Sequence, residues 1–537
     1  MTASQTVSAR RPWMAAVVPL SLCAMAFLLR LHFFSGFILG DDPINFGVVQ
    51  DELTRGPHFR GIVEMRWTKW LVQAAVMNVL GVSETSFFLP IWLLSSGLSV
   101  IGYGLLRRWG YAVGEAWLAG AFIATAPFEI LSGTLLTNDL FMAWPLNLAL
   151  FVLVRFDRRP VLQGSVVATL LWLAFYGKLS AVCAVPAVGF YYVWRGVKER
   201  DWRGGRAFAV VYLGWHGLTE LFWKATLGRF FPLAIYSSPT YPVAWVDVPK
   251  LFLDYPRFLF KGSEFGTTLF GVVPYLLAAL LAVKAVVSLR RSTRACPMAF
   301  DRWDVFLGAY YAVWFLLLNF FPETFHFDRY YSVTRIFRYL TPLSFPMTLH
   351  VGKMLLDLAR WRSTVTRPLP SLAAVIIVPC VVLNVFGAAE ATRPGRIYRR
   401  SLLGIVHEIE RQCPSQVVAE SWPAFFLRSV YVREACGGHI EVVDPPPETI
   451  DTAEKHERWL ADHEADFPEG TFLVTGLASY VHYGCHGCGF RLRKFRERLS
   501  PRWRHVGEYG VLTYLPLPEP ARLWRLTNRA EKPAAGP

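Results

Sequence analysis

Two adjacent carboxylates, Asp41 and Asp42, directly follow the first apolar stretch of the sequence. Acidic groups at a membrane boundary usually have a functional role, because transferring them out of water costs free energy. A carboxylate in this place can act as a general base or as a ligand for a cation. The alternative is a solvated loop in which Asp42, standing before Pro43, caps a helix. The residue types leave both interpretations open.

Cationic side chains follow these acids in the same long loop, which contains His58, Arg60 and Arg66. Arginine binds two phosphate oxygens through paired N–H donors, so these residues could hold a phosphate at the membrane surface. Their simpler role is to anchor the chain at the membrane interface.

A second cationic group lies near the start of a late apolar stretch and comprises His326, Arg335, Arg338 and Tyr339. Arg335 and Arg338 are about one helical turn apart. The positive N-terminal end of the following helix would add to an anion site there. Interface anchoring by arginine and tyrosine is again the alternative.

Three other polar positions lie beside or inside apolar stretches. Asp139 either caps a helix or faces a cavity at the outer membrane face. Lys178 lies between two apolar runs, where its side chain could reach the interface or bind a phosphate. His216, Glu220 and Lys224 recur at a spacing of four and so share one helical face. That face lines a polar cavity or carries an intrahelical Glu–Lys pair.

Eleven apolar stretches must position these residues, and they predict a polytopic α-helical membrane protein. The 537-residue chain is 53% hydrophobic and 15% aromatic, values that a soluble domain rarely reaches. Near the end of the first stretch, Arg30 is expected to extend its side chain to the interface. The stretches are 13–34, 86–106, 112–132, 139–155, 161–177, 179–194, 207–225, 267–289, 304–321, 338–356 and 370–389.

Basic clusters follow every second stretch, as Arg107 and Arg108 follow the second one. Because positively charged loops stay in the cytoplasm, this pattern places the N-terminus there. An odd number of stretches then puts the tail on the other side of the cell membrane. We therefore predict a transmembrane domain over residues 1–390 and an extracytoplasmic soluble domain over residues 391–537.

The net charge of +15 does not indicate nucleic-acid binding. The basic residues form short clusters beside apolar stretches, which is how membrane topology is encoded, and they form no single stripe. We expect membrane lipid as a partner and no nucleic acid.

The tail alternates helix-like and strand-like segments, which predicts a small α/β domain. The expected helices are 397–412 and 452–464, and the expected strands are 416–419, 440–443, 471–475 and 511–515.

Four of the eight cysteines lie in this tail, at Cys413, Cys436, Cys485 and Cys488. Four cysteines in a domain outside the cytoplasm favour two disulfides, with three possible pairings. Neighbouring histidines make a metal site the competing interpretation. Because the usual zinc arrangement needs a second Cys-x-x-Cys pair, we expect disulfides and no metal ion here.

Taken in order along residues 30–355, these motifs resemble the GT-C membrane glycosyltransferases that use polyprenyl-phosphate sugars. The similarity is greatest to the protein O-mannosyltransferase superfamily and the related aminoarabinose transferases of lipid A. The resemblance rests on the acid pair after the first helix, Leu80-Gly81-Val82-Ser83-Glu84, Thr137-Asn138-Asp139, Tyr176-Gly177-Lys178 and Arg338-Tyr339-Leu340-Thr341-Pro342-Leu343.

The resemblance implies roles for several of the residues above. In that family the first-loop acids are usually Asp-Glu and supply the catalytic base. Asp41 would be that base, and Asp42 would stand in the Glu position. Because this chain has Asp-Asp where the family has Asp-Glu, which of the two acts as base is left open. Asp139 would match the acid of the second outer loop. Lys178 and Arg338 would match basic residues near the lipid phosphate.

The expected activity is transfer of a hexosyl or pentosyl group, with inversion, from a polyprenyl-phosphate donor to a glycan, lipid or protein acceptor at the extracytoplasmic face. A divalent cofactor, Mg²⁺ or Mn²⁺, is left open because the named acids could bind a cation or act without one. Two alternatives are a secondary transporter and a non-catalytic membrane scaffold whose tail is a binding domain.

Overall fold

Contacts between residues divide the chain into two units. The first comprises Met1–Phe33, Pro57–Val72 and Leu89–Ala391, and the second comprises Phe34–Gly56, Gln73–Phe88 and Thr392–Pro537. The computed structural model describes residues 12–37, 41–56, 65–134, 137–228, 230, 242–243, 254–260, 269–290, 296–320, 330–331, 340–365, 372–419, 421–433, 435–446, 453–477, 499–511 and 520–527.

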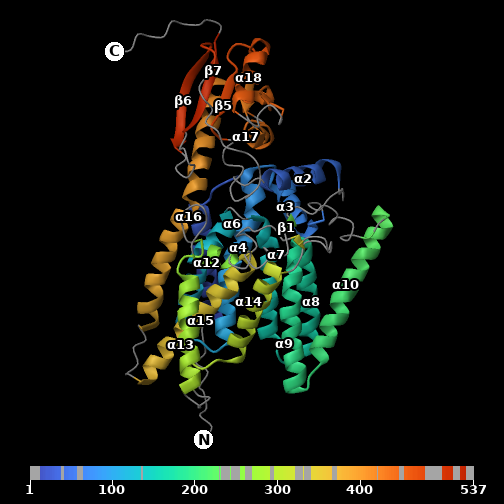
Figure 1. The fold of residues 1–537 in the computed structure, drawn as a ribbon, viewed down its shortest axis with the longest axis vertical. Helices are drawn as coiled ribbons and strands as arrows, with labels where there is room; N and C mark the ends of the chain where they lie inside the picture. The colour runs from blue at the N-terminus through green and yellow to red at the C-terminus, as the bar shows by residue number, and fades with distance from the viewer. Residues whose placement is uncertain are drawn as a thin grey trace. The chain divides into compact units, whose positions relative to one another are not determined.

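The first unit is built of long helices that run alongside one another (Figure 1). Its helices are α1 (Pro12–His32), α5 (Val113–Thr125), α6 (Pro127–Thr134), α7 (Thr137–Arg155), α8 (Pro160–Gly177), η1 (Leu179–Cys183), α9 (Ala184–Glu199), α10 (Arg203–Leu227), α12 (Asp254–Phe260), α13 (Val273–Arg290), α14 (Arg302–Phe320) and α15 (Thr341–Val365). A two-stranded sheet pairs β1 (Pro242–Val243) with β2 (Tyr330–Tyr331). Three helices continue from one unit into the other: α3 (Trp67–Leu80), α4 (Glu84–Arg108) and α16 (Leu372–Gln412).

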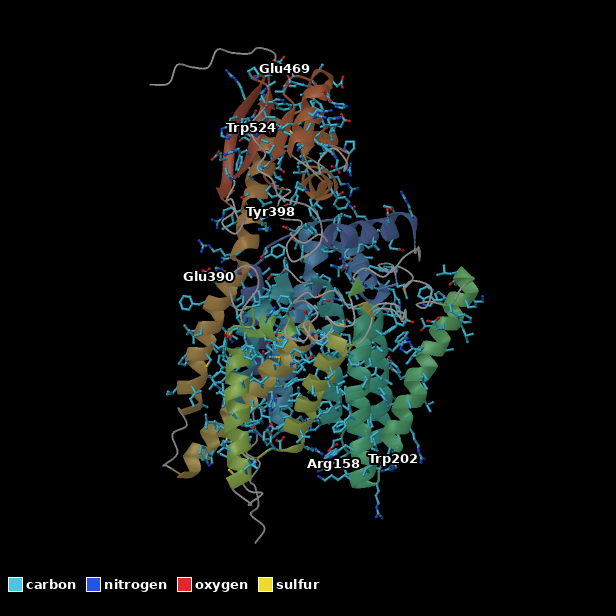
Figure 2. The ribbon with its side chains drawn as sticks, viewed as in Figure 1. Arg158, Trp202, Glu390, Tyr398, Glu469 and Trp524 are labelled. Carbon is cyan, nitrogen blue, oxygen red and sulfur yellow. A yellow bond between two sulfur atoms is a disulfide. The ribbon has the colours of Figure 1, made fainter. Side chains whose placement is uncertain are left out.

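Each of the eleven expected apolar stretches coincides, over most of its length, with helix in the described residues. Of these, Glu84–Arg108, Pro160–Gly177 and Ala373–Arg393 are long and apolar enough to cross a membrane by themselves. The pair α5 and α6, bent by 54° at their junction, adds a fourth candidate. The count of eleven spans stays a prediction. Figure 2 shows Arg158 and Trp202, from two of the expected cytoplasmic loops, at the same end of the first unit.

The structure corrects the expectation for Arg30, whose side chain does not extend to an interface. Arg30 is buried, and its guanidinium donates to Ser95 Oγ at 2.9 Å and to the carbonyl of Ala124 at 2.6 Å. Ala124 lies in the last turn of α5, where carbonyls lack a partner within the helix. The break between α5 and α6 therefore supplies an internal acceptor that the sequence pattern did not reveal.

The second unit contains a five-stranded mixed sheet in the order β4-β3-β5-β7-β6. The strands β3 (Gln416–Ala419), β4 (Glu441–Val443) and β5 (Phe472–Thr475) are parallel, whereas β6 (Trp503–Val511) and β7 (Pro520–Leu526) are antiparallel to their neighbours. Val418, Leu460, Phe467, Leu473, Trp503 and Leu526 form its core. Figure 2 labels Tyr398 on α16 and Trp524 on β7 in this unit.

The helices of this unit are α2 (Asp41–Arg55), α17 (Ser421–Phe426), α18 (Ala453–His463), a π-helical turn η4 (Leu427–Tyr431) and 3₁₀ turns η5 (Ala435–Gly438) and η7 (Glu464–Asp466). Helix and strand occupy the tail segments expected from sequence, except for the strand predicted at 511–515. The described strand there is β6, which ends at Val511, and residues 512–515 lie outside the described part.

Candidate functional site

Four of the sequence-predicted site residues have described side chains, and all four belong to the first unit: Arg66, Asp139, Lys178 and Glu220. Asp41 and Asp42 begin α2, but their side chains lie outside the described part of the chain. His58, Arg60, His326, Arg335, Arg338 and Tyr339 fall outside the described residues, as do Cys485 and Cys488.

Asp139 and Lys178 form a buried ion pair between the first turn of α7 and the C-terminal end of α8. Lys178 Nζ donates to Asp139 Oδ1, and their side chains are only 7% and 1% exposed. A buried charge is stable only with a partner, so each residue depends on the other. The predicted alternatives of interface snorkelling and simple helix capping do not describe this geometry.

Gly177 explains how the two helices approach closely enough for this pair. A Cβ atom added at Gly177 would lie 2.8 Å from the carbonyl oxygen of Phe141, which is closer than real contacts allow. Only glycine therefore lets the end of α8 pack against α7 here. Lys178 follows as the first non-helical residue and is delivered to Asp139, two positions before Phe141.

Arg66 lies beside the same end of α8. The next residue, Trp67, packs against Trp172 and Tyr176 of α8 with ring centroids 5.5 and 6.0 Å apart. Among the residues that the structure describes, Arg66 Nε is buried and has no hydrogen-bond partner. An unpaired buried donor is costly, so an anionic ligand that accepted this hydrogen bond would remove a penalty. Arg66 and Lys178, both predicted to bind phosphate, are thus each adjacent in sequence to a residue at the C-terminal part of α8 or packed against it.

Glu220 shares its helical face with His216, as the spacing predicted, and this face meets α8. The His216 ring lies edge-on to Phe175 at 4.9 Å, and Glu220 is half-buried near Tyr176. Lys224, the third residue of this spacing, contacts the end of its own helix. Its ammonium donates to the carbonyl of Gly228 at 2.8 Å, where it caps the end of α10.

A larger buried ionic cluster joins α13, α14 and α15, and sequence reasoning missed it. Lys284 Nζ lies 2.7 Å from Asp304 and 2.9 Å from Asp357. Lys353 Nζ contacts the same two carboxylates at 3.0 and 3.1 Å. His350 Nε2 lies 3.0 Å from Asp304. The spacing of His350, Lys353 and Asp357 places them on one helical face, and this was the signal that could have revealed the cluster.

This cluster lies at the ends of α13 and α14 that the segment 291–301 joins, and that segment belongs to an expected cytoplasmic loop. Tyr111, from the turn between α4 and α5, adds a hydrogen bond to Asp357 Oδ1. Every charge of the cluster therefore has an oppositely charged partner inside the protein. We interpret the cluster as a structural tie between helices, distinct from the Asp139–Lys178 pair.

The substitution Asp304→Asn should strongly destabilise the first unit. It removes one carboxylate from two buried lysines, and breaking such a pair costs about 3 kcal/mol of unfolding free energy. Chemical denaturation of the protein in detergent measures this loss. Glu199→Gln, which alters an exposed carboxylate whose partner Arg195 keeps Asp157, is the matched control and should leave the midpoint nearly unchanged. Equal midpoints for the two variants would contradict the tying role of the cluster.

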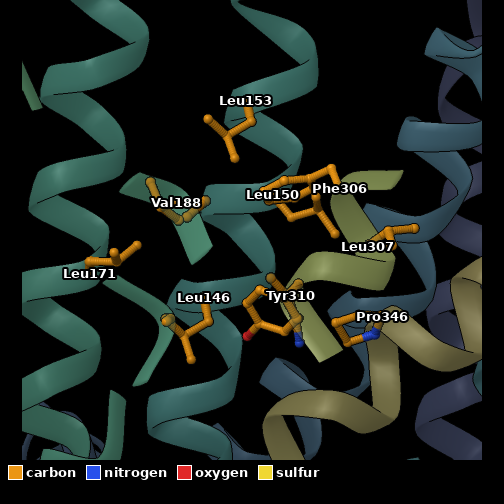
Figure 3. A pocket seen from close by; sticks show the side chains of 12 residues that line it. Leu146, Leu150, Leu153, Leu171, Val188, Phe306, Leu307, Tyr310 and Pro346 are labelled. Carbon is orange, nitrogen blue, oxygen red and sulfur yellow. The ribbon is translucent and has the colours of Figure 1, made fainter. Parts of the chain in front are cut away.

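A small apolar cavity of about 20 Å³ lies among α7, α8, α9, α14 and α15. Figure 3 shows Leu146, Leu150, Val188 and Phe306 around it, together with Tyr310. None of the sequence-predicted site residues is part of its lining. The cavity has no charged lining residue and room for little more than one water molecule, so it is not a candidate ligand site.

In the tail, Cys413 and Cys436 form a disulfide with their Cα atoms 5.6 Å apart. The sequence left three pairings of the four tail cysteines open, and this bond is one of the possible disulfides. In the part of the chain that the structure describes, no three His, Cys, Asp or Glu side chains gather in a way that could hold a metal ion.

Comparison with solved structures finds a similar fold over nearly the whole chain. The chain is similar to ArnT from Cupriavidus metallidurans, solved bound to undecaprenyl phosphate, with a TM-score of 0.51 and 11% sequence identity over 98% of this chain and 100% of that one. At this identity the likeness is one of fold alone.

The arabinofuranosyltransferase AftD from Mycobacteria has a TM-score of 0.45 and 14% identity, covering 98% of this chain and 40% of that one, a likeness too slight to define a fold. No protein-family model and no curated protein matches the sequence.

Proposed function

We propose that this protein is a membrane glycosyltransferase that moves a sugar from a polyprenyl-phosphate donor to an acceptor at the extracytoplasmic face. The observation that carries the proposal is the buried Asp139–Lys178 pair at the end of α8, in a fold similar to that of ArnT. The buried Arg66 Nε, without a hydrogen-bond partner among the described residues, supports it. ArnT was solved bound to undecaprenyl phosphate. A lipid-linked donor suits such a protein because the carrier chain can stay in the bilayer.

In the proposed reaction, a hydroxyl oxygen of the acceptor attacks the anomeric carbon of the donor sugar. The bond between that carbon and the phosphate oxygen breaks, and the configuration at the carbon inverts. Asp41 accepts the hydroxyl proton as general base, with Asp42 as the alternative. Polyprenyl phosphate leaves with the bonding electron pair.

Cationic groups stabilise the negative charge that develops on the leaving phosphate. Lys178 has three N–H donors, so its ammonium can bind a phosphate oxygen while it keeps Asp139 as a partner. Arg66 would donate its unpaired N–H to the same phosphate. Arg338, Arg335 and Arg60 are proposed to serve the same purpose from their loops.

We further propose that the chain passes the cell membrane several times, with the N-terminus in the cytoplasm and residues 391–537 outside as a soluble domain. Glu220, His58, His326 and Tyr339 would contribute to a polar cavity at the outer face.

Whether sugar transfer requires Mg²⁺ or Mn²⁺ is tested by assaying the protein after chelation of divalent ions, with and without each ion restored.

Mass spectrometry of lipids retained by the purified protein tests the donor class. The proposal expects a polyprenyl phosphate or its sugar ester, enriched over the surrounding membrane lipid. The variant Lys178→Met should retain less of it, because one phosphate contact is removed. Retention of bulk phospholipid alone, in both proteins, would argue against a polyprenyl-phosphate donor.

A further inference from the structure

The segment between Cys413 and Cys436 forms an arm that is closed by its own disulfide. We call residues 413–436 the disulfide arm. It contains β3, α17 and the π-helical turn η4. The strand β3 lies inside the sheet, paired with β4 on one side and β5 on the other. The arm is therefore fixed both by the sheet and by the covalent bond, and its helical part, α17 with η4, packs beside the strands.

The helical part of the arm, α17 with η4, packs against α2, the helix that begins at Asp41. Phe425 meets Phe46 of α2 with ring centroids 6.4 Å apart. Gln50 Nε2 of α2 donates to the carbonyl of Ser429 at 3.5 Å. Phe426 stacks on Phe37, just before α2, with centroids 4.5 Å apart. The rings of Phe37, Phe46 and Phe426 are at most 2% exposed, so these aromatic contacts bury one side of α2 against the arm.

A second contact joins the arm to the start of α4 and to α16. Tyr431 donates to Glu84 Oε1 at 2.7 Å, and Arg399 Nη2 contacts Glu84 Oε2 at the same distance. Burial, followed by the effect of the Glu84 carboxylate, raises the pKa of Tyr431 well above its ordinary value. The hydroxyl thus stays protonated and remains a donor to Glu84.

The chain that leads into α2 passes directly over this ion pair. Gly36 has a φ of +72°, and a Cβ atom there would lie 2.7 Å from Glu84 Oε1 and 2.8 Å from Arg399 Cδ. Glycine is therefore required at this point, both for its backbone conformation and for the close approach. The ion pair and the disulfide arm thus both contact the chain at Gly36 and Phe37.

We propose that the disulfide arm is a positioning element for α2, the helix that begins at Asp41, with Phe426 and Tyr431 as positioning residues. This inference rests on the proposed function. A base must lie within hydrogen-bond reach of the proton it accepts, and a displacement of about 1 Å can lower a rate by about 10²-fold. Loosening the aromatic contact would let α2 tilt, which would slow the chemical step and spare donor binding.

The test compares two matched variants of the full-length protein, Phe426→Leu and Phe467→Leu. Both phenylalanines are buried in the second unit, at 2% and 8% exposure, but Phe467 belongs to the core of the sheet. The rate of sugar transfer at saturating donor and the donor KM are measured with radiolabelled undecaprenyl-phosphate sugars. Hydrogen–deuterium exchange of the peptide 41–55 reports on α2 directly and needs no activity.

For Phe426→Leu we expect a transfer rate about tenfold lower or more, a donor KM within about twofold, and faster exchange in 41–55. For Phe467→Leu we expect a rate within about twofold and unchanged exchange in 41–55, even if its unfolding midpoint falls. Tyr431→Phe, which removes only the hydroxyl contact with Glu84, should change the rate and the exchange in the direction of Phe426→Leu.

Equal transfer rates in Phe426→Leu and Phe467→Leu, or exchange in 41–55 that Phe426→Leu leaves unchanged, would overturn the positioning role. The experiment distinguishes failure of the proposed glycosyltransferase function from failure of the positioning role of the arm. If the unaltered protein transfers no label, the proposed function falls, and the exchange of 41–55 still decides whether the arm holds α2.

Discussion

The substitution Asp41→Asn is expected to lower the rate of sugar transfer by about 10²- to 10⁴-fold, the range that a general base contributes. Asparagine has nearly the shape of aspartate but cannot accept the acceptor's proton, so the protein should fold normally and still bind its donor. The measurement is transfer of label from a polyprenyl-phosphate sugar, with the unfolding midpoint taken as a check on folding.

The matched control is Asp42→Asn, because the two carboxylates are adjacent and differ in their match to the family motif. A large loss in Asp41→Asn with a small loss in Asp42→Asn assigns the base to Asp41. The reverse pattern assigns it to Asp42. Full activity of Asp41→Asn together with Asp42→Asn would remove the first-loop acids from the mechanism.

The second large effect is expected from Lys178→Met, which leaves the Asp139 carboxylate buried without its cation. Loss of one member of a buried ion pair costs about 3–5 kcal/mol of unfolding free energy. Transfer should fall as well, by about 10²-fold, because a preorganised donor to the leaving phosphate is lost. Chemical denaturation in detergent and the transfer assay measure the two losses separately.

The double variant Asp139→Asn with Lys178→Met separates stability from catalysis. Removing both charges relieves the uncompensated carboxylate, so the double variant should regain most of the lost stability. Its transfer rate should stay low, since the cation is still absent. A double variant that recovers both stability and transfer would show that Lys178 serves only to hold the fold.

The positions of the helices could be predicted because apolar stretches of membrane length leave few other structures open to the backbone. Similarly, the strands β3 and β5 are short runs of buried apolar residues and were recognised as such. In contrast, β6 and β7 carry Arg504, His505 and Arg522 at partly exposed positions, which hides their alternation. The two strands become recognisable only through their pairing with each other and with β5.

The contacts of the candidate site could be predicted only in part. The motifs indicated that Asp139 and Lys178 matter, but their pairing depends on how Gly177 lets α8 approach α7. No local pattern reports such an approach between segments about forty residues apart in the chain. The same holds for the disulfide arm, whose phenylalanines look like ordinary core residues until α2 is seen against them.

The most direct test of the central claim is incubation of the purified protein with a panel of radiolabelled undecaprenyl-phosphate hexoses and pentoses, in the presence of glycan, lipid and protein acceptors. We expect label from at least one donor to appear on an acceptor, with release of undecaprenyl phosphate and loss of both in Asp41→Asn. Label that is bound or carried across a membrane but never transferred would contradict a glycosyltransferase and favour a transporter or a scaffold.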